Sequence, residues 1–397
     1  MRVGSKTKFL VLFSLAVALV ACSGINLRTG FVRDPAIEAQ IIDQSADLYA
    51  DVDPLYISAD IKALLDREID PGADAEARVR TIQDILYGTD FLNLQYNDAR
   101  THTAQEAFEA REGNCLSAMN LFVAMARYAG VDANFQTVDV RPHWDTRNNL
   151  LVLSNHINAT GKFSFQRSYV ADFTPEIALQ QLTSREVDDR YARALYFNNL
   201  GVEAMVAEDL DQAFRYFKNA LFLEPELSIA WNNIGASYKR VGNTEFAEYS
   251  YHMAFLTEDS NATAVNNLAK HYRETGDVLR ADEYELAIER FNDQNPYYHF
   301  ARGQLAWEEK DLVSAAESFS KALELKQTEP DFYLALSAVF TVLGDNESAE
   351  LMKQSAEDLI AGNAQIFRPS AEKLRIIDSS RILRDHRPGT TINFENL

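Results

Sequence analysis

The sequence has few cysteines and a deficit of basic residues, and it lacks the short motifs of several enzyme classes. Two cysteines among 397 residues exclude a scaffold held together by several disulfides. Lysine and arginine number 38 against 59 aspartates and glutamates, and the formal charge of −21 repels phosphate backbones, so we expect no nucleic-acid partner. The chain contains no HExxH, CxxC, GxGxxG or P-loop motif, and we therefore expect no metal and no cofactor.

The N-terminal residues 1–21 have the pattern of a cleaved signal peptide. Three basic residues precede an apolar run of 13 residues, which is too short to cross ~30 Å of hydrocarbon as a stable helix. The run ends in Leu19-Val20-Ala21-Cys22, which resembles the lipobox of bacterial lipoproteins. The resemblance implies a lipid on Cys22, and such a lipid anchors a chain to a membrane surface without a spanning helix. The alternative is an ordinary secretory signal with an incidental cysteine.

The residue after the cysteine and the charge of the processed chain refine this expectation. Ser23 rather than Asp follows Cys22, which favours the outer membrane of a bacterial cell envelope, facing the periplasm, over retention in the inner membrane. Removal of the three basic residues lowers the formal charge from −21 to −24. No later apolar stretch approaches 18 residues, so we expect no spanning helix in the remainder.

The C-terminal half repeats with a period of 34 residues. Five windows in register begin at Ala194, Ser228, Ala262, Pro296 and Pro330. The twentieth residue of each is alanine, the eighth is small, and the sixteenth is Asp or Asn, a side chain suited to capping a turn between helices. This pattern resembles the tetratricopeptide repeat and predicts five helix pairs over residues 194–363, wound into a right-handed superhelix. Glu285 occupies a position that is usually apolar, so the third repeat is expected to be the weakest.

The repeat family implies a concave face that binds a protein or peptide. Asn198, Asn232 and Asn266 recur on the first helix of the first three repeats, and basic side chains accompany them at Lys239, Lys270 and Arg273. One interpretation is a polar groove that grips an extended peptide. In the other, the asparagines are merely solvated, because an Asn pair before Leu or Ile is common in such repeats.

Residues 57–175 lack the period and have a mixed α/β pattern. We expect helices at 74–87 and 115–128 and strands at 134–140, 150–159 and 166–173. Cys115 comes at the start of the second helix, directly after the turn residues Gly113 and Asn114. Backbone N–H groups and the positive end of the helix dipole stabilise a thiolate there, and they can also receive an oxyanion.

A cysteine nucleophile needs a base, and the base needs an orienting acceptor. His156 on the second strand and Asp172 on the third are the candidates, because adjacent strands bring their side chains together at the helix start. His143 is a rival base, although its neighbour Pro142 predicts a loop there. The second oxyanion donor is unidentified, and the candidates by polarity alone are Asn93, Gln95 and Tyr96.

Four segments resemble the bacterial transglutaminase-like superfamily: 113–117, 121–138, 155–158 and 171–173. The resemblance implies a papain-like α+β domain in which Cys115 is the nucleophile, His156 the general base and acid, and Asp172 the residue that fixes the imidazole tautomer. The family usually has an aromatic residue soon after the histidine, whereas Ile157 and Asn158 follow here. Two of these residues also have a purely structural interpretation. In it, Cys115 is a packed helix cysteine and Asp172 caps a turn.

The expected fold class is therefore an α+β papain-like/transglutaminase-like domain followed by an all-α tetratricopeptide superhelix. The expected segments are a signal peptide at 1–21, a lipidated tether at 22–56, the domain at 57–175, a helical connection at 176–193, the repeats at 194–363 and a tail at 364–397. One hypothesis is a cysteine-dependent enzyme that hydrolyses or transfers an amide through a thioester, with the repeats recruiting a protein or peptide. The other is a non-catalytic lipoprotein scaffold that uses both parts for binding.

Overall fold

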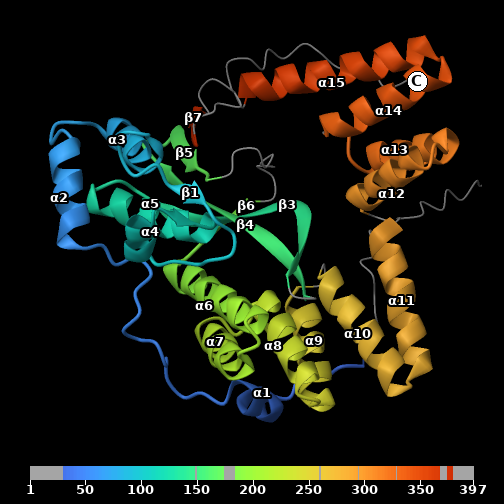
Figure 1. Ribbon diagram of the computed structural model, residues 1–397, viewed down its shortest axis with the longest axis horizontal. Helices are drawn as coiled ribbons and strands as arrows, with labels where there is room; N and C mark the ends of the chain where they lie inside the picture. Colours follow the sequence, from blue (N-terminus) through green and yellow to red (C-terminus); the bar gives the residue numbers. More distant parts are fainter. Residues whose placement is uncertain are drawn as a thin grey trace, which may run out of the picture.

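The computed structural model describes residues 30–147, 150–173, 184–258, 261–293, 295–327, 329–366 and 373–378, so the signal peptide and Cys22 lie outside its description. The described chain has two parts, a domain of helices around one sheet and a curved array of helix pairs (Figure 1). Within these ranges no helix has both the length and the apolar character needed to cross a bilayer.

The helices of the first part enclose α5, Cys115–Tyr128. Eleven consecutive residues of α5, from Leu116 to Ala126, are buried, because helices and the sheet contact it from several sides. A helix that is apolar all round requires such enclosure. The other helices and the short strands of this part are α2 (Ala59–Glu68), α3 (Ala75–Tyr87), β1 (Gln95–Tyr96), α4 (Ala104–Ala110) and β2 (Glu112–Gly113).

An antiparallel sheet of five strands, in the order β6-β3-β4-β5-β7, covers α5. Its strands are β3 (Asn134–Arg147), β4 (Leu150–Lys162), β5 (Arg167–Ala171), β6 (Ser184–Val187) and β7 (Leu374–Asp378). Pro142 and His143 lie within β3, so the predicted loop at this point was wrong. The ladder with β4 shifts register between Val138 and His143, and a proline is tolerated at such an irregularity because it needs no donor there.

The predicted helical connection at 176–193 was also wrong for residues 184–187, although residues 189–193 are helical. Ser184–Val187 form β6, an edge strand paired with β3, and α6 begins only at Asp189. The first helix of the array therefore follows the edge strand β6 almost directly. Two contacts fix this junction: the guanidinium of Arg127 on α5 binds both carboxylate oxygens of Asp189, at 2.6 and 2.9 Å, and Glu203 on α6 accepts the Thr101 N–H at 2.7 Å.

The array consists of five antiparallel helix pairs in the predicted register, counted over the described residues. Its all-α character confirms the second half of the predicted fold class. The pairs are α6 (Asp189–Val206) with α7 (Leu210–Leu223), α8 (Ser228–Arg240) with α9 (Thr244–Thr257), α10 (Ala262–Thr275) with α11 (Val278–Asp293), α12 (Pro296–Glu308) with α13 (Leu312–Leu325), and α14 (Pro330–Leu343) with α15 (Asn346–Ile366).

Helices of one pair approach closely where a glycine faces an aromatic ring. A Cβ added at Gly303 would lie 2.5 Å from the ring of Phe319, and one at Gly235 would lie 2.8 Å from the ring of Tyr251. In the third and fifth repeats the ring is replaced by a charged residue, and the glycine is replaced as well. The corresponding pairs there are Ala269 with Glu285 and Ser337 with Lys353.

Among the side chains that the structure describes, the buried hydrophobic residues form two clusters. One core runs from the first part through the array to α11, and a second, smaller core occupies α12–α15. Glu285 binds Arg273 at 2.6 Å in place of packing a ring, and the weakness expected of the third repeat stays a prediction. The third repeat nevertheless stacks on the second, since Ala264, Leu268 and their neighbours belong to the first core.

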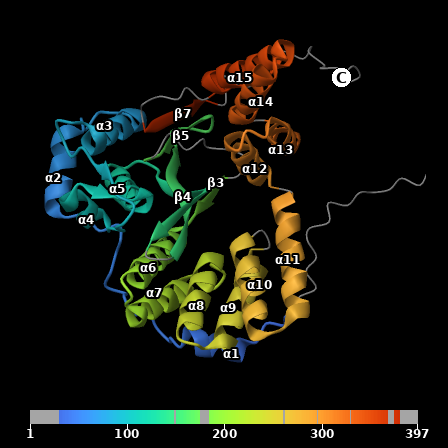
Figure 2. The same ribbon diagram turned by 45° about the vertical axis from the view of Figure 1, so that its right-hand side comes forward.

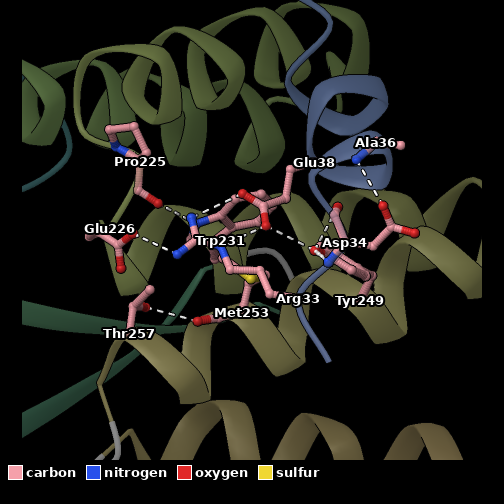
Figure 3. A network of polar contacts seen from close by, with 10 residues as sticks. All are labelled: Arg33, Asp34, Ala36, Glu38, Pro225, Glu226, Trp231, Tyr249, Met253 and Thr257. Atoms are coloured by element: carbon pink, nitrogen blue, oxygen red, sulfur yellow. Dashed lines mark hydrogen bonds and ion pairs between the residues drawn. The ribbon is translucent and has the colours of Figure 1, made fainter. Parts of the chain in front are cut away.

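The N-terminal segment packs on the array, as Figure 3 shows for its polar contacts. Phe31 stacks on His252 at 4.7 Å, and the hydroxyl of Tyr249 accepts the Asp34 N–H at 2.8 Å and donates to Glu38 at 3.0 Å. Helix α1 (Pro35–Ile42) then lies against α7. The predicted tether over 22–56 was therefore wrong for residues 30–42.

The C-terminal segment returns to the sheet. Helix α15 continues to Ile366, and residues 374–378 form β7 on the edge of β5, beside which it lies in both views (Figure 1 and Figure 2). The prediction of a tail from 364 onward was wrong for these residues. The array is therefore inserted between the two edge strands of the sheet, β6 before it and β7 after it.

Replacing Gly303 by alanine should destabilise the last two repeats by about 1–3 kcal/mol, because the new methyl group overlaps the Phe319 ring. The higher helix propensity of alanine would by itself stabilise the helix by up to about 1 kcal/mol. A net loss of stability therefore identifies the overlap with the ring. Urea unfolding of the full chain measures it. The cost should shrink when Phe319→Leu is introduced first, and a Gly303→Ala variant as stable as the parent would contradict this packing.

Candidate active site

The turn that precedes α5 is held by two side chains near Cys115, those of Asn114 and Ser117. Asn114 is the N-cap, and its side-chain oxygen accepts both the N–H and the hydroxyl of Ser117, each at 2.9 Å. The Ser117 oxygen in turn accepts the His102 N–H at 2.7 Å. Gly113 has no side chain because a Cβ there would lie 2.5 Å from that of Ser117. The Gly-Asn-Cys sequence thus places Cys115 at the first residue of the helix.

The three predicted catalytic residues lie together in the structure. The sulfur of Cys115 is 3.9 Å from Nδ1 of His156, and Nε2 of His156 is 2.9 Å from Oδ2 of Asp172. His156 and Asp172 are each 2% exposed, whereas Cys115 is partly exposed. Asp172 follows β5 directly rather than lying inside the strand as predicted. The ring therefore bridges the thiol and the carboxylate through its two different nitrogens.

The electrostatics of His156 result from two opposing effects. Burial by itself lowers the pKa of the imidazole, but the hydrogen bonds to Asp172 and Cys115 outweigh burial and raise the pKa to about 9. The protonated imidazolium form of His156 is thus favoured near neutral pH. One of its N–H groups is directed to Asp172 and the other toward the sulfur of Cys115. Within the described ranges no group of three or more His, Cys, Asp or Glu side chains is arranged to hold a metal ion.

Two polar residues near the triad were not singled out from the sequence. Tyr87 ends α3 and stacks on Phe173 at 5.6 Å. Burial first, and then the negative charges of Asp172 and Cys115, raise the pKa of its hydroxyl. Asn158 is 1% exposed and lies two residues after His156, which places both on the same face of β4. Among the described residues neither the Tyr87 hydroxyl nor the Asn158 amide has a hydrogen-bond partner.

The sequence signals for these two residues were weak. Tyr87 looked like the last apolar residue of a helix, and only the two-residue spacing from His156 could have pointed to Asn158. Buried polar groups normally have a hydrogen-bond partner, so the two side chains are unusual in this respect.

The three candidate oxyanion donors lie in or just before β1: Gln95 and Tyr96 form the strand, and Asn93 precedes it. In this exposed strand Tyr96 pairs with Gly113, two residues before Cys115. The Gln95 side chain donates to the carbonyl of Asn93 at 2.7 Å, and the Tyr96 ring lies 5.7 Å from that of Phe173. The role of any of them as a donor stays a prediction.

The rival base is separated from His156 along the same pair of strands. His143 pairs with Ser154 across the ladder, whereas His156 pairs with Val138 on the other side of the register shift. The side chain of His143 lies outside the described part of the chain.

Two of the six predicted groove residues are structural. Asn198 is 1% exposed and its side-chain oxygen accepts from Asn233 of the next repeat at 2.9 Å; Asn232 does the same with Asn267 at 2.8 Å. The prediction that these residues line a binding face was wrong, because each amide joins neighbouring repeats.

The basic members of the predicted groove are mostly paired with acids. Lys239 binds Glu274 at 2.9 Å, and Arg273 binds Asp282 and Glu285 at 2.7 and 2.6 Å. Lys270 is exposed and Asn266 is half-buried, so these two remain the candidates for contact with a peptide.

Both parts of the chain are similar to known proteins. Residues 63–171 match the family model of the Transglutaminase-like superfamily, which includes Cys115 and His156 and ends one residue before Asp172. The human protein O-mannosyl-transferase TMTC3 is 26% identical over 208 residues, which are 48% of this chain and 22% of that protein. The tetratricopeptide repeat-containing protein trd-1 of Caenorhabditis elegans is 20% identical over 55% of this chain and 28% of its own length.

Solved structures similar to this chain include those of repeat proteins. A crystal structure of MamA covers 42% of this chain and 97% of its own, at 17% identity and a TM-score of 0.24. YrrB, titled a TPR protein with an unusual peptide-binding site, covers 42% of this chain and 86% of its own, at 18% identity and a TM-score of 0.24. The chain spans about a fifth of the length of human TMTC3.

The predicted fold class is confirmed by the family match and by the helix pairs of the array. The chain contains a transglutaminase-like domain and tetratricopeptide repeats.

The pKa of about 9 predicts a pH-dependent stability that His156 controls. The unfolded chain loses this proton near pH 6.5, so the stabilisation is present in full below about pH 6.5 and is lost as the pH rises through about 9. Urea unfolding at pH 6.5 and 9.5 should give a larger fall in the free energy of unfolding for the parent than for His156→Gln. Equal falls would contradict the assignment.

Proposed function

We propose that this chain is a lipid-anchored protein of the bacterial cell envelope whose transglutaminase-like domain cleaves or transfers an amide through a thioester on Cys115. The observation that carries this proposal is the geometry of the triad. A thiol at a helix N-terminus lies 3.9 Å from an imidazole, and that imidazole is buried against a carboxylate 2.9 Å away. These are the relations that a cysteine nucleophile, its base and an orienting acceptor require.

The first half of the reaction uses a thiolate and an imidazolium. The Cys115 thiolate attacks the amide carbonyl carbon, and the helix N-terminus faces the developing oxyanion. His156 then gives its Nδ1 proton to the amide nitrogen, the C–N bond breaks, and an amine leaves. The acyl group remains on the sulfur as a thioester. Asp172 accepts from Nε2 throughout, which stabilises the positive ring and fixes its orientation.

The second half releases the acyl group to water or to a primary amine. His156, now neutral, takes a proton from the attacking molecule through Nδ1, and the acyl C–S bond breaks. Water yields a carboxylic acid and completes amide hydrolysis, whereas an amine yields a new amide. The cysteine leaves as a thiolate beside the imidazolium, which restores the starting pair.

The repeats supply a surface for a protein or peptide substrate. The family of such repeats binds extended peptides, and the exposed Lys270 with the half-buried Asn266 are the residues offered for that contact. The formal charge of −21 supports a protein or peptide partner over a nucleic acid.

The anchor would hold the array close to the membrane. Cys22 precedes Phe31 by nine residues, and Phe31 stacks on the second repeat. Nine residues reach at most about 30 Å when extended. A lipid on Cys22 would therefore keep the second repeat within this distance of the bilayer, and the substrate would be captured near the membrane surface.

Alkylation of Cys115 tests the enzymatic function. At pH 6, iodoacetamide should modify Cys115 about tenfold faster than it modifies a free thiol, because a thiol at a helix N-terminus and beside an imidazolium is more reactive than a free one. His156→Gln and Asp172→Asn should each remove most of this advantage. Mass spectrometry of the labelled peptide identifies the site and gives the rate.

A buried histidine outside the site provides a matched control for this experiment. His299 is also buried, at 6% exposure, and lies in α12 away from the domain, so His299→Gln should leave the rate unchanged. A non-catalytic scaffold, the alternative function, requires no activated thiol. Labelling of the parent at the rate of a free thiol, insensitive to His156→Gln, would favour that alternative.

The anchor is tested by Cys22→Ser. When expressed in a bacterial host fed with labelled palmitate, the parent should incorporate the label and sediment with membranes. The variant should do neither, because its hydroxyl does not replace the thiol as the lipid acceptor. A variant that still incorporates palmitate would exclude Cys22 as the attachment site.

A further inference from the structure

The strand β7 lies directly beside the residue that orients His156. β7 pairs with β5 antiparallel, with Leu374 opposite Ala171, and the Lys373 carbonyl accepts the Asp172 N–H at 2.8 Å. The ladder between β4 and β5 has its last pair at Ala159 and Ala171, one residue before Asp172. The main chain that carries the Asp172 carboxylate is thus held by a segment 200 residues away in the sequence.

The side chain of Lys373 joins two aromatic residues of the site. Its ammonium lies 4.1 Å from the ring centre of Phe173 and 4.5 Å from that of Tyr87. Phe173 is 1% exposed and immediately follows Asp172 in the chain. Because a cation is attracted to the faces of such rings, this contact fixes Phe173, and with it the backbone at Asp172.

Lys373 directly precedes β7, and two residues of the strand itself support its packing on β5. Leu374 is 3% exposed and belongs to the main core, so it anchors the strand. Arg375 is partly buried: burial lowers the pKa of its guanidinium, and the negative charge of Asp172 acts in the opposite direction. A short strand therefore brings two cations and one apolar anchor to the edge of β5 where Asp172 stands.

We propose that β7 is a positioning element of the site, in which Lys373 and the docked strand hold Asp172 where it orients His156. This inference rests on the proposed function. Since β7 follows α15, the last helix of the array, the reactivity of the Cys115 thiol then depends on a segment that lies after the repeats in the sequence.

The test compares β7 variants of the full chain by their pH profiles of Cys115 alkylation, from pH 5.5 to 9.5. Lys373→Ala keeps the backbone bond but loses the contact with both rings, and it should lower the rate at pH 6 by about threefold or more. Lys373→Arg should restore the parent profile, because arginine also stacks on aromatic rings. Leu374→Asp should undock the strand, lower the rate further and accelerate hydrogen exchange of the Asp172 amide.

Lys62 provides the control, because its ammonium lies 5.8 Å from the ring of Tyr128, away from the triad. Lys62→Ala should leave the profile unchanged. If Leu374→Asp unfolds the domain, the comparison of Lys373→Ala with Lys373→Arg decides. Parent-like profiles for Lys373→Ala would overturn the inference while leaving the proposed function intact. A parent thiol that reacts no faster than a free one would instead count against the proposed function.

Discussion

The antiparallel pairing of β4 with β5 is the constraint on which the site depends. Ala159 pairs with Ala171, so His156 and Asp172 reach the same end of the ladder although 16 residues separate them. A shift of one residue in either strand would turn one side chain to the opposite face. Both side chains are buried in a medium of low dielectric constant, where the hydrogen bonds and charges of Asp172 and Cys115 together outweigh the effect of burial on the pKa of the ring.

The domain and the array are one structure rather than two parts on a linker. A single core extends from α1 and the domain to the third repeat. The bidentate contact of Arg127 with Asp189 and the insertion of the array between β6 and β7 join them on both sides.

Features with local causes could be predicted from the sequence. The start of α5 follows from the Asn114 cap and the apolar run behind it, and the repeat register follows from small residues at a period of 34. Predictions that depended on remote partners failed. Residues 184–187 and 374–378 have no strong pattern of their own and become strands because β3 and β5 offer open edges. Asn198 and Asn232 looked solvated or available, but the next repeat buries them.

The sequence by itself determined the repeat architecture, the helix that presents Cys115 and the identity of the three residues proposed for catalysis. These depend on period, capping and residue type, all of which act over short distances along the chain. Only the tertiary structure decided that β7 holds Asp172, that Tyr87 and Asn158 lie near the triad, and that the N-terminal segment packs on the second repeat. The reason is physical: each of these contacts joins residues far apart in sequence, and their energy comes from the shape of the folded surface rather than from local preference.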